Sequence, residues 1–215
     1  MSQPWTAVVP IKHLTAAKSR LRGALPRVPH EALALALATD TLHAVRSCPA
    51  VTEVLVVTDD PLAVAAARAA GARVVPDIPR AGLNAAFRRG ASAAGDSWVA
   101  GLTADLPALR PAELAAALRA ARTGPPGVRG FVADAPGCGT VLLAAPPGVP
   151  LDPRFGVGSA EAHAASGARR LAGDWPSLRR DVDTPDDLAA AVRLGLGPRT
   201  AALVAAENRA GSTAG

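Results

Sequence analysis

The chain has 215 residues and a formal net charge of +5, with 49% apolar and 19% charged residues. This composition excludes a disordered chain, and the length is sufficient for one domain with a full hydrophobic core. No apolar run reaches the length of a membrane span, and the first residues lack the pattern of a secretory signal. We therefore expect a cytoplasmic protein that binds no membrane.

The first 120 residues alternate between patterns of buried strands and patterns of helices. In chain order we expect strand 5–10, helix 30–47, strand 53–58, helix 61–70, strand 73–75, helix 83–94, strand 98–103 and helix 111–122. This alternation predicts an α/β fold with a doubly wound, mostly parallel sheet. In such sheets the binding site lies beyond the carboxyl ends of the strands.

The pattern changes after the Gly124-Pro125-Pro126-Gly127 cluster. Short strands are expected at 130–133 and 140–144, a short helix near Ser159 and a last helix over 184–194. From Gly197 we expect a tail that is poorly ordered at its end. The sequence thus predicts one domain over residues 1–196, with a small β-containing insertion, and a C-terminal tail over 197–215.

The segment after the first strand carries both lysines of the chain, Lys12 and Lys18, in a sequence with 21 arginines. Two retained lysines indicate a need for a compact, flexible ammonium group, which binds phosphate well as a point charge. The segment has neither GxxxxGK[ST] nor GxGxxG, which disfavours P-loop NTPases and nicotinamide dehydrogenases. It predicts a triphosphate site, with a solvated loop as the alternative.

Carboxylates in two separate segments are candidate metal ligands. Asp105 follows a buried strand, and Mg²⁺ takes one or two carboxylates together with phosphate oxygens. The alternative for Asp105 is a cap of the turn before the next helix. Asp181 and Asp183 lie just before a helix start, and alternation along an extended segment points them to the same side. One of them is expected to be a second metal carboxylate.

Two glycine-rich segments, 134–140 and 154–159, each offer backbone N–H groups followed by a hydroxyl. Together they are expected to hold a second phosphorylated molecule beside a nucleotide. No Ser–His–Asp or Cys–His arrangement is present, and the histidines are expected on the surface or in the core; they are His13, His30, His43 and His163. Cys48 and Cys138 form no disulfide framework and are expected to be reduced thiols.

Six motifs occur in order along the chain. They are Pro10-x-Lys12 with Ala17-Lys18-Ser19-Arg20-Leu21, then Gly82-Leu83-Asn84, Ala104-Asp105-Leu106-Pro107, Gly137-x-Gly139-Thr140, Phe155-Gly156-x-Gly158-Ser159 and Asp181-Val182-Asp183-Thr184-Pro185. Over about residues 5–195 the chain resembles the 2-phospho-L-lactate or phosphoenolpyruvate guanylyltransferase family of coenzyme F-420 biosynthesis. The resemblance implies a nucleotide-diphospho-sugar transferase-like variant of the Rossmann fold, Mg²⁺ as cofactor and GTP as substrate.

The family transfers GMP from GTP to the phosphate of a small phospho-acid and releases pyrophosphate. By resemblance, Lys12, Lys18 and Arg20 would contact the GTP phosphates, and Asn84 would lie in the nucleotide pocket. Asp105 and Asp183 would hold Mg²⁺ and, with Lys18, form the catalytic group. Asp181 is an alternative to Asp183.

The small insertion would bind the acceptor, because the resemblance places Thr140, Gly156 and Ser159 at the phospho-acid. A nucleotidyltransferase for molybdopterin or a sugar phosphate is the alternative, although the LxGGxxxRM-type loop is absent. A basic nucleic-acid-binding module is a further alternative, disfavoured by scattered arginines without aromatic platforms. We expect small-molecule substrates and no nucleic acid. The sequence leaves open which phospho-acid is used. It also leaves open whether the protein forms a homodimer and whether it passes its product to a downstream transferase.

Overall fold

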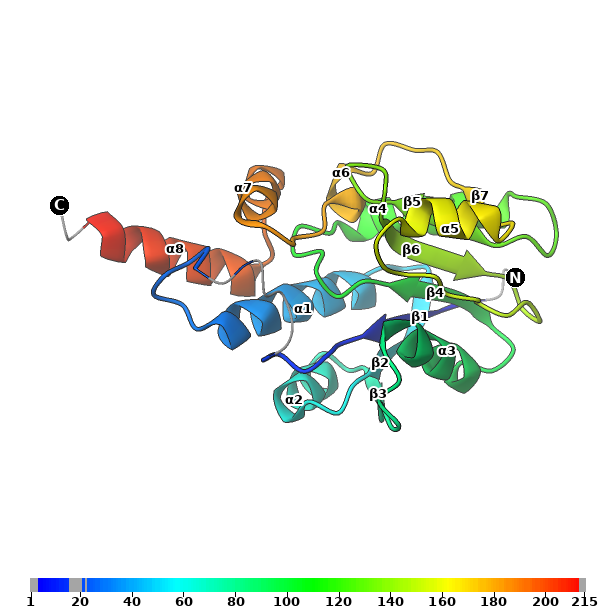
Figure 1. Ribbon diagram of the computed structural model, residues 1–215, viewed down its shortest axis with the longest axis horizontal. Coiled ribbons are helices and arrows are strands. Elements are labelled where there is room, and N and C mark those ends of the chain that lie inside the picture. Colours follow the sequence, from blue (N-terminus) through cyan, green and yellow to red (C-terminus); the bar gives the residue numbers. More distant parts are fainter. Residues whose placement is uncertain (1–3, 16–20, 22, 213–215) are drawn as a thin grey trace.

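The computed structural model describes residues 4–15, 21 and 23–212, and it is built on one seven-stranded sheet (Figure 1). The strands are β1 (Trp5–Pro10), β2 (Val51–Val57), β3 (Arg73–Val75), β4 (Trp98–Leu102), β5 (Gly130–Ala133), β6 (Thr140–Ala145) and β7 (Arg169–Arg170). They lie in the order β3-β2-β1-β4-β6-β5-β7. β6 is antiparallel to both of its neighbours, whereas the other pairs are parallel. The expected doubly wound, mostly parallel sheet is therefore confirmed.

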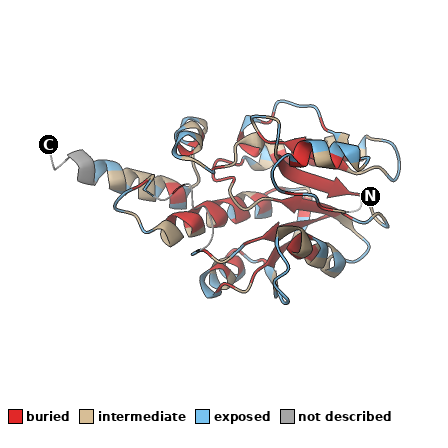
Figure 2. Cartoon of the chain, in the orientation of Figure 1, coloured by how far each residue is buried: buried red, intermediate tan, exposed pale blue. Residues whose placement is uncertain are grey.

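Helices cover both faces of the sheet. They are α1 (His30–Arg46), α2 (Pro61–Ala69), α3 (Leu83–Ala93), α4 (Pro111–Arg122), α5 (Ser159–Ala165), α6 (Pro176–Arg179), α7 (Pro185–Leu194) and α8 (Pro198–Ser212). Buried side chains of α1, α2 and α4 share one core cluster, and those of α3 and α5 share another on the opposite face. Figure 2 shows the strands and the inner faces of these helices as the buried part of the molecule.

Successive side chains of β1 point to opposite faces of the sheet, so this strand contributes to both core clusters. Ala7 and Val9 belong to the cluster under α1, whereas Val8 belongs to the cluster under α3. On the α3 side, a Cβ at Gly90 would collide with the Val8 side chain. Glycine at this position therefore allows α3 to approach the sheet closely.

The structure adds three elements to those expected from the sequence. The strand β7 has two residues and the helix α6 has four, so neither is long enough to produce a periodic pattern. The third is α8, which lies in the segment expected to be a poorly ordered tail.

Tertiary contacts explain why α8 is helical despite a weak amphipathic pattern. Asp40 of α1 accepts hydrogen bonds from the backbone N–H groups of Arg199 (3.0 Å) and Thr200 (2.7 Å), in the first turn of α8. A cap supplied by another helix cannot be read from local sequence. In the described part of the chain no single helix could span a bilayer. Only α7 and α8 taken together meet that length and composition, with a bend of 114° between them.

Candidate functional site

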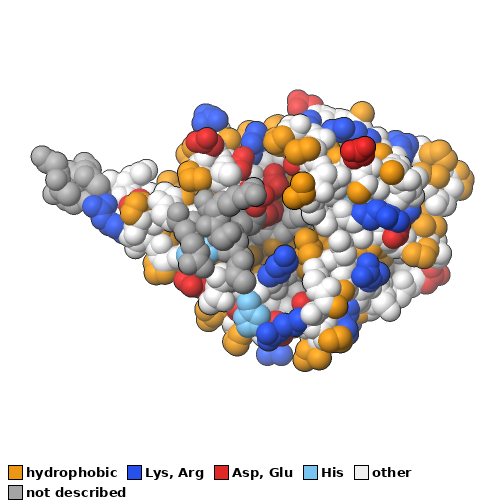
Figure 3. Space-filling view, in the orientation of Figure 1, with side chains coloured by type: hydrophobic (Ala, Val, Ile, Leu, Met, Phe, Trp, Pro, Cys, Tyr) orange, Lys and Arg blue, Asp and Glu red, His pale blue; other side chains and the backbone are white. Residues whose placement is uncertain are grey.

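A cavity of about 660 Å³ lies beyond the carboxyl ends of β1 and β4. β6 runs in the opposite direction, so its first residue, Thr140, reaches the same edge of the sheet. Figure 3 shows acidic side chains gathered in the hollow of this face. The polar or glycine residues that line the cavity are Lys12, Thr103, Asp105, Asp134, Gly139, Thr140, Gly156, Gly158, Ser159, Asp181 and Asp183.

One wall of the cavity is acidic because two loops are bonded together there. The backbone N–H of Val182 donates to the carbonyl of Asp105 at 3.0 Å. Val182 is fully buried, and its neighbours Asp181 and Asp183 both line the cavity. The expected alternation is therefore confirmed, and it brings three carboxylates to one wall.

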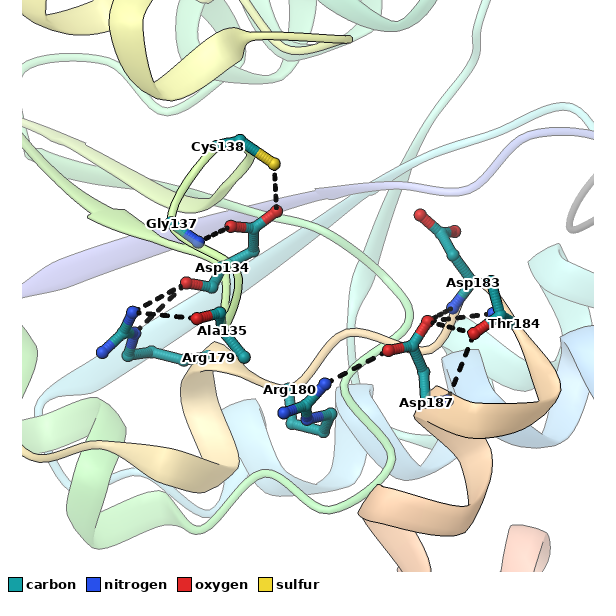
Figure 4. Close-up of polar contacts among 9 residues, drawn as sticks. All are labelled: Asp134, Ala135, Gly137, Cys138, Arg179, Arg180, Asp183, Thr184 and Asp187. Carbon is teal, nitrogen blue, oxygen red and sulfur yellow. Dashed lines mark hydrogen bonds and ion pairs between the residues drawn. The ribbon is translucent and has the colours of Figure 1, made fainter.

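The helix after this wall is capped without using the Asp183 side chain, although the Asp183 N–H also donates to Asp187 Oδ2 at 3.4 Å. Asp187 Oδ2 accepts from the Thr184 backbone N–H (3.0 Å) and hydroxyl (2.7 Å), and the Asp187 N–H donates to Thr184 Oγ1 (3.2 Å). Arg180 contacts the other carboxylate oxygen of Asp187 at 3.1 Å. Figure 4 shows the Asp183 carboxylate pointing away from this capping box. Capping thus accounts for Asp187 and leaves the Asp183 carboxylate directed to the cavity.

The lysine segment is tied to the start of α2. Asp60 caps α2 and also accepts a hydrogen bond from the Leu14 backbone N–H at 3.1 Å. His13 Nε2 lies 3.2 Å from an Asp59 oxygen. Burial opposes ionisation of Asp60, but the N–H groups of Ala63, Leu14 and Leu62 outweigh it and hold the pKa below its usual value. These contacts fix the backbone beside Lys12, whose side chain lines the cavity. Lys18 and Arg20 lie outside the described residues.

The opposite wall is the loop between β5 and β6. Asp134 accepts from the backbone N–H groups of Gly137 (2.6 Å) and Gly139 (2.8 Å), and a Cβ at Gly139 would collide with its carboxylate. Arg179 donates to the Asp134 carbonyl at 2.9 Å (Figure 4). The Ala160 N–H of α5 donates to the Cys138 carbonyl at 3.0 Å. Hydrogen bonds therefore hold this loop from two directions, from Arg179 and from Ala160 of α5.

The segment 154–158 borders the same wall and is held by Asn84. The Asn84 amide donates to the Phe155 carbonyl at 3.0 Å and accepts from the Phe155 N–H at 2.8 Å. The Phe155 ring stacks on Phe87, with centroids 4.1 Å apart. Gly156 (φ 139°) and Gly158 (φ 70°) adopt backbone conformations that favour glycine.

His163 of α5 is completely buried beneath this wall. Its Nδ1 lies 2.9 Å from Thr140 Oγ1, and its Nε2 accepts a hydrogen bond from the Arg154 backbone N–H at 2.9 Å. Burial lowers the pKa of His163 from 6.5 to about 4, against a raising effect of the Ser159 carbonyl. Arg129 and Arg154 lower the pKa further, and Asp152 raises it. His163 is therefore neutral near pH 7.

The charges of the cavity are unbalanced among the described residues. Four carboxylates line it, those of Asp105, Asp134, Asp181 and Asp183, against the single cation Lys12. Within residues 4–15, 21 and 23–212, no three His, Cys, Asp or Glu side chains come together as a metal cluster. A donor set of separated carboxylates fits a hard cation that keeps several waters or phosphate oxygens, which is how Mg²⁺ is bound.

The cavity brings together most of the residues singled out in the sequence. Lys12, Asp105, Asp181, Asp183, Thr140, Gly156 and Ser159 line it, whereas Asn84 lies beside it with its amide on Phe155. Their roles toward ligands stay predictions. The sequence reasoning missed the loop-forming role of Asp134, although Asp followed by glycines at +3 and +5 is a turn signal. It also missed the contacts of His163, which no local pattern could reveal because Thr140 is 23 residues away.

The sequence matches a known protein family and named proteins. The model of the MobA-like NTP transferase domain matches residues 34–174. A phosphoenolpyruvate guanylyltransferase of Salinispora arenicola is 72% identical over 203 residues, which cover 94% of each chain. The enzyme of the same name from Geodermatophilus obscurus is 56% identical, covering 93% of this chain and 94% of its own.

Solved structures support the same fold at low identity. A nucleotidyl transferase from Methanothermobacter has a TM-score of 0.62 and 19% identity, covering 90% of this chain and 98% of its own. A putative nucleotide-diphospho-sugar transferase from Desulfovibrio desulfuricans has a TM-score of 0.67 and 15% identity, covering 97% and 96%. At these identities the likeness concerns the fold alone.

Proposed function

The chain belongs to the phosphoenolpyruvate guanylyltransferases within the MobA-like NTP transferase family, and we propose that it transfers GMP from GTP to phosphoenolpyruvate, releasing pyrophosphate, in coenzyme F-420 biosynthesis. The observation that carries the proposal is the division of one cavity into two unlike walls. Carboxylates of the 105 and 181–183 loops form one wall. The other wall has the Thr140 and Ser159 hydroxyls with Gly156, and its one carboxylate, Asp134, accepts from the loop N–H groups of Gly137 and Gly139.

The two walls suit two different anions. A nucleoside triphosphate needs cations, and Lys12 is the described cation of the cavity, to which the proposal adds Lys18 and Arg20. A phospho-acid needs hydrogen-bond donors at both its phosphate and its carboxylate, which the hydroxyls of Thr140 and Ser159 supply. We assign Asp105 and Asp183 to Mg²⁺, with Asp181 as the alternative to Asp183.

The reaction is a displacement at the α-phosphorus of GTP. An oxygen of the acceptor phosphate forms the new bond to this phosphorus, and the bond to the β-phosphate oxygen breaks, so pyrophosphate leaves with the electron pair. The acceptor phosphate is already a nucleophile, so the chain needs no strong general base. Bound Mg²⁺ would neutralise charge on the triphosphate and on the leaving group.

The chain's own residues then act by positioning. Asp105 and Asp183 would hold Mg²⁺ at the triphosphate, and Lys12 holds phosphate charge on the side of β1. The opposite wall holds the acceptor phosphate near the α-phosphate. Overcoming repulsion between two anions and aligning them supplies most of the acceleration expected for such a transfer. The absence of a nucleophilic side-chain triad from the sequence agrees with this chemistry.

The second candidate function is transfer of GMP to 2-phospho-L-lactate, which differs from phosphoenolpyruvate at the carbon that bears the phosphate. The same hydroxyl wall would bind either acid. A nucleotidyltransferase for molybdopterin or a sugar phosphate stays the alternative prediction. Cytoplasmic location, a homodimer and hand-off of product to a downstream transferase stay predictions.

An acceptor panel tests the proposal. The protein is incubated with Mg²⁺, GTP and, in turn, phosphoenolpyruvate, 2-phospho-L-lactate or a sugar phosphate, and pyrophosphate is measured. The downstream transferase is coupled to the assay so that a labile product does not inhibit the enzyme. We expect pyrophosphate with GTP and phosphoenolpyruvate, and much less when CTP, UTP or ATP replaces GTP. Absence of pyrophosphate with both phospho-acids, coupled or uncoupled, would contradict the proposal.

A further inference from the structure

The hydroxyl of Thr140 lies between a buried ring and the cavity. Thr140 lines the cavity, yet only 6% of the residue is exposed, and its Oγ1 is 2.9 Å from Nδ1 of the fully buried His163. The direction of the hydrogen bond between these two atoms decides what the hydroxyl can do. If the hydroxyl accepts from His163, its single hydrogen remains for another partner.

The other ring nitrogen settles that direction. Nε2 of His163 faces the backbone N–H of Arg154 at 2.9 Å, and a backbone N–H can only donate. Nε2 must therefore carry the lone pair, and in the neutral ring the hydrogen lies on Nδ1. This tautomer follows from the hydrogen-bond network.

Thr140 is thus an acceptor toward the ring and has one hydrogen left. Among the residues that the structure describes, no other group takes that hydrogen. Thr140 lines the cavity together with Ser159 and Gly156. A buried hydroxyl with an unused donor in a residue that lines a cavity is a site for an acceptor atom, and an anionic oxygen is the strongest one.

We propose that His163 is a positioning residue that makes the Thr140 hydroxyl a dedicated hydrogen-bond donor to an anionic oxygen of the phospho-acid acceptor. The inference rests on the proposed guanylyltransferase function. The same ring also holds the Arg154 N–H, so it fixes the Thr140 hydroxyl relative to the segment that carries Gly156. The lowered pKa of His163 agrees with this arrangement, because only a neutral ring has an Nε2 lone pair that accepts from the Arg154 N–H at pH 7.

Two amide substitutions separate the two functions of the ring. In His163→Gln the amide reaches the place of Nε2, so it can accept from Arg154 but cannot donate to Thr140. In His163→Asn the amide reaches the place of Nδ1, so its NH₂ group can donate to Thr140 as the ring does. His43→Gln, on the exposed face of α1, is the matched control.

With GTP and phosphoenolpyruvate as substrates, we expect His163→Gln to reduce kcat/KM for the phospho-acid by about 10- to 100-fold, the loss of one hydrogen bond to a charged group. The KM for GTP should change little. Thr140→Val should show a similar loss, and the double variant His163→Gln with Thr140→Val should lose no more than the larger single loss. His163→Asn should recover most of the activity. Circular dichroism and the thermal midpoint show whether each variant is folded.

The outcomes distinguish this inference from the proposed function. If the wild-type protein makes no pyrophosphate from phosphoenolpyruvate, the function itself is wrong. If the wild type is active and His163→Gln matches it, or the two single losses multiply in the double variant, the positioning role is overturned and the function stands. Ring ¹⁵N chemical shifts of labelled histidine give a readout without substrate, with His163 assigned from its variant. A hydrogen on Nε2 would also overturn the inference.

Discussion

Asn84 and Phe155 exchange two hydrogen bonds across 71 residues, from the amide to the carbonyl (3.0 Å) and from the backbone N–H to the amide oxygen (2.8 Å). This pair connects α3, on one side of β1, with the segment that carries Gly156 and Gly158. Asn84 therefore acts on the cavity through the backbone it holds.

We expect Asn84→Ala to lower the free energy of unfolding by about 1 to 3 kcal/mol, because two part-buried hydrogen bonds are lost. The KM for the phospho-acid should also rise, since the segment 154–158 loses its anchor. Urea unfolding and steady-state kinetics check the two effects. Asn208→Ala, at an exposed position of α8, is the control and should change neither. A variant with altered GTP binding and an unchanged phospho-acid KM would instead favour the nucleotide role expected for Asn84.

We expect the carboxylates of the acidic wall to determine how activity depends on the Mg²⁺ concentration. We expect Asp105→Asn to reduce turnover on the order of 100-fold or more, because loss of a metal carboxylate removes several kcal/mol of transition-state stabilisation. Titration of activity with Mg²⁺ should show a raised requirement in Asp183→Asn or in Asp181→Asn, which identifies the second ligand. Asp186→Asn is the control, because Asp186 is exposed in the first turn of α7 and does not line the cavity. Full activity of Asp105→Asn would remove Asp105 from the metal site.

Substitution of Lys12, which lines the cavity, tests whether GTP binding needs only a positive charge or also the compact shape of the ammonium group. Lys12→Arg keeps the positive charge but replaces a compact ammonium group with a planar fork. We expect a clear rise in the KM for GTP, measured with saturating phospho-acid, and a similar effect of Lys18→Arg. Arg68→Lys, on α2 and away from the cavity, is the control for exchange between these two cations. Normal GTP use by both lysine variants would show that any cation suffices.

The buried His163 predicts a specific dependence of stability on pH. Its pKa is about 4 in the folded protein and about 6.5 when unfolded, so between these values the unfolded chain holds a proton that the folded chain lacks. The free energy of unfolding should fall by up to about 3 kcal/mol as the pH falls from 6.5 to 4, and this contribution should be complete above pH 6.5. Unfolding of the wild type and of His163→Gln across this range measures it. Equal pH slopes in the two proteins would contradict the prediction.

We expect the Asp40 carboxylate to hold the first turn of α8 against α1. Asp40→Ala removes the acceptor of two N–H groups at the start of α8, and we expect a loss of about 1 to 2 kcal/mol. Amide hydrogen exchange should rise first in α8 and then in the adjoining end of α1. Asp96→Ala, in an exposed turn, is the control. Unchanged protection of α8 would show that its apolar contacts alone hold it.

Most of the sheet could be predicted from the sequence because its strands are short apolar runs closed by polar loops. The shared side of Asp181 and Asp183 was predictable from alternation along an extended segment, whereas placing them with Asp105 at one site depended on the family resemblance of the motifs. The helix α8 could not be predicted, because the Asp40 cap is 159 residues from Arg199. Asn84 was assigned to the nucleotide pocket from the family motif and His163 to the surface or the core from its residue type, whereas their partners come from segments that only the folded chain brings together.

The position of β6 between β4 and β5 affects the order in which strands can join the sheet while the chain is being synthesised. A ribosome releases β5 before β6, so β5 emerges with no neighbour in the sheet, and the edge of β4 stays open until β6 follows. We expect the hairpin of β5 and β6 to dock as a unit on the strands already formed. A nascent chain that ends before Thr140 contains β1 to β5 but lacks the Thr140 and Ser159 hydroxyls that line the cavity. It therefore gains the hydroxyl side of its cavity only in the last third of translation.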